Sequence, residues 1–187
     1  MDGLLESRGL DPRGSYVAFI LRPWPGFEDK LAVFAAAADD AYNRHGLTPV
    51  FFPIERQLDV EAGRKAAALV TVPHHILEST GSSAHTIGML SRMRVVVSMR
   101  LHGLVFAAGQ GVPLVGVVYD QKVSSFLSYI GQDLFTQLES LTEEGLKAQL
   151  DAACARMSDQ EFLAGGVERL RLAEEENSKA AARLLEP

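Results

Sequence analysis

Residues 95–132 read VVVSMRLHGLVFAAGQGVPLVGVVYDQKVSSFLSYIGQ and contain the clearest structural pattern of the chain. Two apolar runs, Val95–Ser98 and Pro113–Tyr119, have the length and the β-branched content of buried strands. Helical spacing follows each run, over Leu101–Gln110 and then over a segment for which Asp120 is a good N-cap. Strands that are apolar on both faces and alternate with helices predict a parallel sheet covered on both sides.

The same alternation extends toward the N-terminus. Further strands are expected at Tyr16–Leu21, Thr48–Ile54 and Ala68–Val72, and the helices between them at Glu28–His45, Asp59–Ala67 and Ser83–Arg92. Right-handed crossovers make such a sheet doubly wound. We therefore expect the α/β class, with a Rossmann-like fold of five parallel strands in the order 3-2-1-4-5.

The chain divides into three predicted parts. Residues 1–14 are expected to be an N-terminal tail or linker, and residues 15–135 the Rossmann-like domain. No strand pattern is evident beyond Gln132, and helical patterns cover Thr142–Met157 and roughly Asp159–Leu185. Residues 136–187 are therefore expected to be a helical C-terminal extension.

Composition narrows the range of functions. The chain has 187 residues, a net charge of −6 and a pI near 5.4, which argues against nucleic-acid binding because that requires a broad basic face. The single cysteine, Cys154, excludes an intramolecular disulfide and a cysteine-based zinc site. No apolar run has the ~20 residues of a membrane span, and residues 1–13 lack the apolar segment of a signal peptide. The expected location is the cytoplasm.

Candidate site residues lie where the predicted strands end. Ligands of open α/β sheets bind there, next to helix N-termini. Arg100 directly precedes one helix and Lys122 lies in the first turn of the next, although the positive end of a helix dipole disfavours cations. Together with His102 they predict a site for a compact anion. Secondary candidates are Arg22, His74 and Glu78, which follow the other strands.

Less specific interpretations remain open for the same residues. A single Arg or Lys at a strand end is most often a solvated surface charge, and His102 opens a largely apolar helix, where a core histidine is common. His74 and its neighbour His75 would point apart, and no carboxylates accompany them at ligand spacing. We therefore expect no metal site. Cys154 falls on an apolar helical stripe and is expected in the core.

Several short motifs together resemble the polysaccharide pyruvyl transferases of the cell-surface-anchoring type. They are the Arg-Leu-His-Gly turn at residues 100–103, the Gly-Val-Pro strand start at 111–113 and the Tyr-Asp-x-Lys-Val helix start at 119–123. The Leu-Arg-Pro-Trp segment at 21–24 is similar to the beginning of the family's second domain. The resemblance covers about residues 15–132.

The resemblance implies an activity and a set of partners. Family members have two Rossmann-like domains that face each other across a cleft, as in GT-B glycosyltransferases. They transfer the enolpyruvyl group of phosphoenolpyruvate to a sugar diol of a cell-wall or exopolysaccharide precursor, which forms a pyruvate ketal and needs no cofactor. The acceptor would be a sugar, or a saccharide linked to a lipid or a nucleotide. The first domain, a further partner, is not contained in these 187 residues.

The resemblance also implies residue roles. Arg100, Lys122 and the backbone amides of Leu101 and His102 would hold the donor. His102 would be the general acid, because the methylene carbon of the donor must gain a proton before a sugar hydroxyl attacks the neighbouring carbon.

Two other functions remain open. The chain could be the nucleotide-sugar half of a GT-B glycosyltransferase or of an epimerase, which would require a carboxylate for the ribose, and Glu78 is the only fair candidate. It could also be a non-catalytic module that binds an anion or a partner chain.

Overall fold

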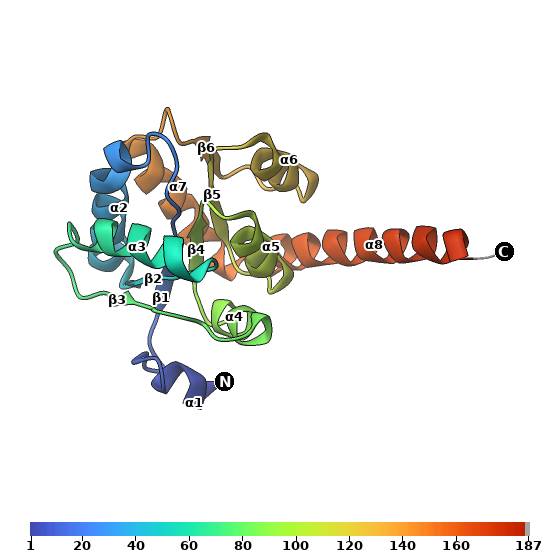
Figure 1. The fold of residues 1–187 in the computed structure, drawn as a ribbon, viewed down its shortest axis with the longest axis horizontal. Coiled ribbons are helices and arrows are strands. Elements are labelled where there is room, and N and C mark those ends of the chain that lie inside the picture. Colours follow the sequence, from blue (N-terminus) through green and yellow to red (C-terminus); the bar gives the residue numbers. More distant parts are fainter. Residues whose placement is uncertain (186–187) are drawn as a thin grey trace.

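Six parallel strands form one sheet with helices on both faces (Figure 1). The computed structural model describes residues 1–185, without the side chains of residues 56, 160–166 and 184–185. The strands are β1 (Tyr16–Ile20), β2 (Thr48–Phe51), β3 (His75–Ile76), β4 (Val95–Ser98), β5 (Leu114–Val118) and β6 (Phe135–Gln137). Their order, β3-β2-β1-β4-β5-β6, contains the predicted 3-2-1-4-5 arrangement and confirms the α/β Rossmann-like class.

Two hydrophobic clusters fill the space between the sheet and its helices. Residues of α2 (Leu31–His45), α3 (Arg56–Ala67) and α7 (Glu143–Ala155) cover one face. The other face is covered by α1 (Asp2–Glu6), α4 (Ser83–Leu90), α5 (Leu101–Gly109) and α6 (Gln121–Tyr129). The short 3-10 helices are η1 (Glu28–Lys30) and η2 (Arg156–Ser158). Successive strand residues alternate between the clusters: Phe19 lies in the first and Ile20 in the second, both fully buried.

The predicted third strand, Ala68–Val72, is wrong. The Asp39 carboxylate of α2 accepts the N–H groups of Thr71 and Val72, at 2.9 and 3.3 Å, and these bonds hold the segment as a loop. The strand that pairs with β2 follows the proline and consists only of His75 and Ile76. The apolar run was therefore misleading, because its hydrogen bonds go to a side chain rather than to a strand.

The prediction that strands end before Gln132 is also wrong. Residues Phe135–Gln137 form β6, which pairs in parallel with β5 from Gly116 to Val118. Its burial is partial at Phe135 and Thr136, and Gln137 is exposed. A three-residue edge strand with two polar residues has too little apolar pattern to be recognised in the sequence.

The N-terminal segment forms part of the fold. Leu5 of α1 and Leu10 are buried in the second cluster together with Leu90 of α4. An ion pair of 2.8 Å between Asp2 and Arg92 adds to this contact. The domain boundaries at residues 15 and 135 stay a prediction.

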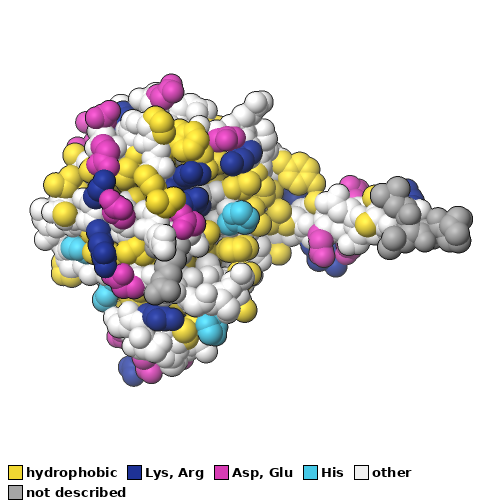
Figure 2. All heavy atoms as spheres, viewed as in Figure 1, with side chains coloured by type: hydrophobic (Ala, Val, Ile, Leu, Met, Phe, Trp, Pro, Cys, Tyr) yellow, Lys and Arg dark blue, Asp and Glu magenta, His cyan; other side chains and the backbone are white. Residues whose placement is uncertain are grey.

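The last helix, α8 (Gln160–Leu185), extends away from the body of the molecule (Figures 1 and 2). Near its base, Leu170 packs against the second cluster, and Arg169 donates a hydrogen bond of 3.0 Å to the carbonyl of Ile130 at the end of α6. Leu172 is 49% exposed. Within the described residues, no helix is both long and apolar enough to cross a membrane.

Candidate functional site

The turn between β4 and α5 is fixed by Ser98, the buried last residue of the strand. Its hydroxyl accepts the N–H of Arg100 at 3.0 Å and donates to the Arg100 carbonyl at 2.9 Å. A Cβ at Gly103 would come within 2.7 Å of this hydroxyl and 2.6 Å of Ile20 Cδ1, so only glycine lets α5 begin so close to the sheet. The first N–H groups of a helix have no partner within it, and the N-cap of α5 offers no side-chain cap. The amides of Leu101 and His102 are therefore available to a ligand.

Arg100 is held by a carboxylate that the sequence did not predict as part of the site. Its Nε lies 2.9 and 3.1 Å from the two oxygens of Asp59, and its Nη2 lies 2.5 Å from Oδ1. Asp59 comes from the first turn of α3, and its side chain is fully buried. Its Oδ2 also accepts the N–H groups of Ile54 and Glu55. Arg100 therefore ties α3 to the β4–α5 turn, and its charge is balanced there.

His102 and Lys122 lie on the helices that follow two neighbouring strands. β4 and β5 pair directly, with Ser98 opposite Gly116, so the helices that follow them begin side by side. His102 is exposed in the first turn of α5. Lys122, in the first turn of α6, has 55% of its side chain exposed and lies 3.6 Å from the Asp120 carboxylate. The structure thus brings these two predicted residues to adjoining helix N-termini.

Asp120 caps α6, as its sequence position predicts. Its carboxylate accepts the N–H of Lys122 at 2.9 Å. This hydrogen bond, together with the charges of Lys122 and Arg22, lowers the pKa of the Asp120 carboxyl below its usual value, against a smaller opposite effect of burial. Asp120 is therefore ionised at neutral pH and offsets part of the positive charge at this helix start.

Arg22, a secondary candidate in the sequence, lies between two aromatic rings. Its guanidinium carbon is 4.8 Å from the ring centre of Trp24 and 4.6 Å from that of Tyr119. Its Nη1 donates a hydrogen bond of 2.5 Å to the Tyr119 hydroxyl, while its buried Nε has no partner. No ion pair joins Arg22 to a carboxylate within the described residues. Because Arg22 follows β1 and Tyr119 follows β5, this contact spans the carboxyl end of β4, which lies between them.

A pocket of about 130 Å³ opens beside this cluster. Trp24 and Pro25 line it from the loop after β1, Val118 and Tyr119 from the end of β5, and Gln137, Leu138 and Glu139 from the end of β6. The rings of Trp24 and Tyr119 pack against each other at an angle of 52°, with their centres 4.5 Å apart. The pocket thus combines aromatic rings with an amide and a carboxylate at the carboxyl edge of the sheet.

The other two secondary candidates lie apart from these residues. His74 Nδ1 is hydrogen-bonded to the Val72 carbonyl at 2.9 Å, and its ring packs edge-on against Phe51. Glu78 is exposed and pairs with Arg64 of α3. Both belong to the far side of the sheet order, around β2 and β3, so the structure does not bring them to His102 and Lys122.

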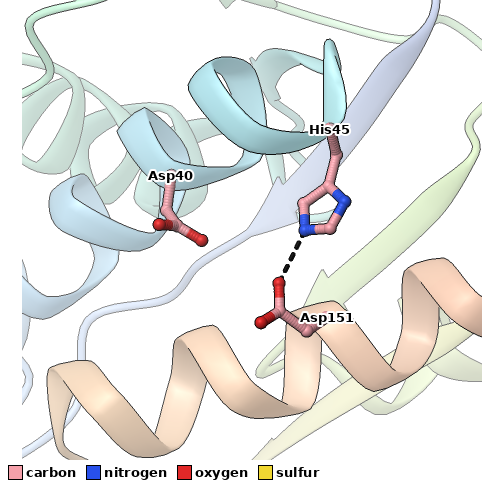
Figure 3. A group of neighbouring side chains, drawn as sticks. All are labelled: Asp40, His45 and Asp151. Atoms are coloured by element: carbon pink, nitrogen blue, oxygen red, sulfur yellow. Dashed lines mark hydrogen bonds and ion pairs between the residues drawn. The ribbon is translucent and has the colours of Figure 1, made fainter.

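One cluster has ligand types that could hold a metal ion. Asp40, His45 and Asp151 place their ligand atoms within 4.8 Å of one another, and the His45 ring points toward Asp151 (Figure 3). His45 Nε2 lies 2.6 Å from Asp151, and Arg44 lies 3.4 Å from Asp40 and 2.8 Å from Asp151. The Arg44 guanidinium already supplies the positive charge that the two carboxylates require. The cluster is therefore an ion-pair network between α2 and α7, at the amino ends of the strands.

The missed residue Asp59 has one usable signal in the sequence. It stands between Leu58 and Val60 on a predicted helix, three and seven residues before Ala62 and Ala66. Ala62 and Ala66 are buried, so an acid shares the inward face of this helix. An acidic residue on such a face indicates a buried partner. No comparable signal identified Gln137 and Glu139, because β6 itself was not recognised.

The profile of the polysaccharide pyruvyl transferases matches residues 2–121. The chain belongs to this family. The match includes Arg22, Arg100 and His102 and ends one residue before Lys122. Among curated proteins, none matches the chain.

Solved structures with the same fold are glycosyltransferases. The glycotransferase of kitacinnamycin is 16% identical with a TM-score of 0.53, over 85% of this chain and 40% of that one. The spinosyn forosaminyltransferase SpnP is 19% identical with a TM-score of 0.55, over 91% and 42%. A structure of EarP-mediated arginine glycosylation of translation elongation factor EF-P gives 14% and 0.52, over 92% and 60%.

These comparisons define the family and the architecture of the chain. The chain has the Rossmann-like fold of one half of a GT-B enzyme, and it spans about 40–60% of the length of the structures it matches.

Proposed function

We propose that the chain is the donor-binding half of an enzyme that transfers the enolpyruvyl group of phosphoenolpyruvate to a sugar diol. The observation that supports this most directly is the pairing of β4 with β5, which sets the N-termini of α5 and α6 side by side. Backbone amides and an imidazole lie in the first turn of α5, and a largely solvated ammonium lies in the first turn of α6. Such a set of donors and charges suits a small, multiply charged anion better than a neutral ligand.

The proposed donor site assigns one role to each group. The N–H groups of Leu101 and His102 would donate hydrogen bonds to the phosphate at the positive end of the α5 dipole. Lys122 would neutralise it further, and Arg22, which forms no ion pair with a carboxylate within the described residues, would supply a guanidinium. Arg100, whose charge Asp59 balances, would mainly position the turn that presents these amides.

His102 would act as general acid in the reaction. It would protonate the methylene carbon of the donor, and one sugar hydroxyl would attack the adjacent carbon and lose its proton. The second hydroxyl would then displace phosphate, which leaves a pyruvate ketal on the sugar. A solvated imidazole can pick up a proton again between turnovers. The acceptor would come from a cell-wall or exopolysaccharide pathway, and the first domain would complete its binding site. The proposed location is the cytoplasm.

The nucleotide-sugar alternative has less support. It needs a carboxylate for the ribose hydroxyls near the diphosphate site. Glu78, the only fair candidate in the sequence, is exposed and paired with Arg64, remote from α5 and α6 in the sheet order.

Ligand titrations test the proposal. We expect phosphoenolpyruvate to bind in calorimetry and to raise the melting temperature of the chain, more strongly than inorganic phosphate. UDP is the comparison ligand. A thermal shift with UDP and none with phosphoenolpyruvate would replace the proposal with the nucleotide-sugar alternative.

A further inference from the structure

The pocket beside Trp24 and Tyr119 has features that the donor chemistry does not use. Its two aromatic rings contact each other in a tilted arrangement, with centres 4.5 Å apart, and Trp24 remains 39% exposed. Aromatic rings offer a broad apolar surface with little conformational freedom to lose on binding. An exposed tryptophan in a pocket at the carboxyl edge of an α/β sheet is therefore a natural contact for a ligand.

The cluster around Arg22 makes this aromatic surface rigid. Arg22 contacts both rings and holds the Tyr119 hydroxyl at 2.5 Å. Pro23 and Pro25 flank Trp24 and restrict its backbone. The rings are thus fixed before a ligand arrives, which reduces the entropy cost of binding.

The polar groups of the pocket determine which ligand fits. Gln137 and Glu139 line it, both are exposed, and neither side chain has a hydrogen-bond partner in the described part of the chain. A carboxylate repels a phosphate or a carboxylate ligand but accepts hydrogen bonds from hydroxyl groups. A ring with an apolar C–H face and hydroxyls at its rim matches both halves of the lining.

We propose that this pocket binds the acceptor, with a pyranose ring on Trp24 and Tyr119 and its hydroxyls on Gln137 and Glu139. The inference rests on the proposed function, since it assigns the second substrate to the same edge of the sheet. Tyr119 begins the segment that contains Lys122 three residues later, so an acceptor held here lies next to the donor site.

The only tryptophan of the 187 residues is Trp24, so intrinsic tryptophan fluorescence reports on this pocket alone. The chain is titrated with methyl β-D-glucopyranoside, methyl β-D-galactopyranoside and methyl N-acetyl-β-D-glucosaminide up to about 100 mM, a range that includes weak binding. Glycerol serves as a polyol without a ring face. We expect a saturable change in emission with at least one glycoside and none with glycerol.

Variants locate the response. Glu139→Gln should weaken glycoside binding about ten-fold, because the hydroxyls would then donate to a neutral amide oxygen instead of a charged carboxylate. Trp24→Ala, followed by saturation-transfer NMR because the fluorophore is gone, should abolish the signal. Tyr129→Ala removes another exposed aromatic ring, on α6, and should change nothing. If Trp24→Ala does not fold, Glu139→Gln still decides the question.

Failure of this inference can be told apart from failure of the donor proposal. Lys122→Ala should weaken phosphoenolpyruvate binding and keep the glycoside response. The inference is overturned if no glycoside changes the emission, if glycerol has the same effect, or if Glu139→Gln binds as the unchanged chain does. It is also overturned if uridine saturates the fluorescence response and glycosides do not, since the aromatic rings would then bind a nucleobase rather than a sugar.

Discussion

The two edges of the sheet carry charged clusters of opposite character. At the amino ends of the strands, Asp40, Arg44, His45 and Asp151 bond to one another. At the carboxyl ends, the buried Nε of Arg22 has no partner, and the ammonium of Lys122 is largely solvated. A network whose groups satisfy each other stabilises the fold, whereas groups left without partners are available to a ligand. Charge clusters therefore indicate a site here only where their bonding is incomplete.

The Arg100–Asp59 pair is the exception, because its two groups bond to each other although the pair lies at the carboxyl ends of the strands. Asp59→Ala would leave the Arg100 guanidinium, with 15% of its side chain exposed, without its main partner. We expect the free energy of unfolding to fall by about 3–5 kcal/mol, the cost of breaking a buried pair from one side. Urea denaturation measures this. The control, Glu78→Ala, breaks an exposed pair and should cost under ~1 kcal/mol. Equal losses in the two variants would contradict the distinction.

Kinetics of a His102 variant test the role of the carboxyl ends of the strands in catalysis. In an enzyme that includes the first domain, His102→Ala should lower kcat on the order of 10²-fold or more and leave most donor binding intact, since the proton is needed only in the transition state. Steady-state kinetics and calorimetry with phosphoenolpyruvate separate the two effects. His85→Ala, which removes an exposed histidine from α4, is the matched control. An unchanged kcat in His102→Ala would end the general-acid assignment.

Lys122→Ala separates the surface interpretation from the ligand-binding one. The pair with Asp120 is 3.6 Å long and both side chains are exposed by a third or more, so we expect the unfolding free energy to stay within ~0.5 kcal/mol. The backbone N–H of residue 122, which the Asp120 carboxylate accepts as helix cap, is retained in the variant. Binding of phosphoenolpyruvate should weaken by ~1.5–3 kcal/mol, as for a charge-assisted contact. Thermal melts with and without donor measure both. A lower melting temperature without donor, together with an unchanged shift on adding it, would make Lys122 a surface charge.

Much of the fold could be predicted because its strands are buried on both faces. The helix Leu31–His45 ends at Gly46 with φ of 65°, as its glycine predicts, and Asp120 and the buried Cys154 also lie as expected. Burial raises the pKa of the Cys154 thiol to about 11, in keeping with a core residue. What failed was β3 and β6, the edge strands. They are short and half-exposed, and their register is set by neighbours rather than by their own apolar pattern.

The places of the candidate residues in the fold were predictable, but their bonding was not. Arg100, His102 and Lys122 lie at strand ends and helix starts, and the β4–β5 pairing places the helices that carry the last two side by side. The partner of Arg100 comes from α3, 41 residues earlier, and no local spacing relates the two. Arg22 and Tyr119 are 97 residues apart for the same reason. Which charge is balanced and which is free depends on such tertiary contacts.

The smallest expected effect on stability concerns the ion-pair network of Asp40, Arg44, His45 and Asp151 at the amino ends of the strands. Burial alone would raise the pKa of the Asp151 carboxyl, but hydrogen bonds from His45 and Arg44 lower it below its ordinary value of 3.8. A carboxyl whose pKa is lower in the folded state stabilises the protein fully above the unfolded pKa. This contribution is lost as pH falls through the folded pKa. The difference in unfolding free energy between the unchanged chain and Asp151→Asn should therefore shrink between about pH 5 and about pH 3.

Urea titrations at each pH measure this difference. Asp40, Arg44 and His45 face the carboxyl and remain in both proteins, so their own titration largely cancels in the comparison. Glu144→Gln, exposed on the same helix α7, is the control and should show a smaller change with pH because its carboxylate lacks these partners. A difference that stays constant or grows as the pH falls would mean that Asp151 gains nothing from its partners. The charged groups at the amino ends of the strands would then satisfy each other no better than those at the carboxyl ends.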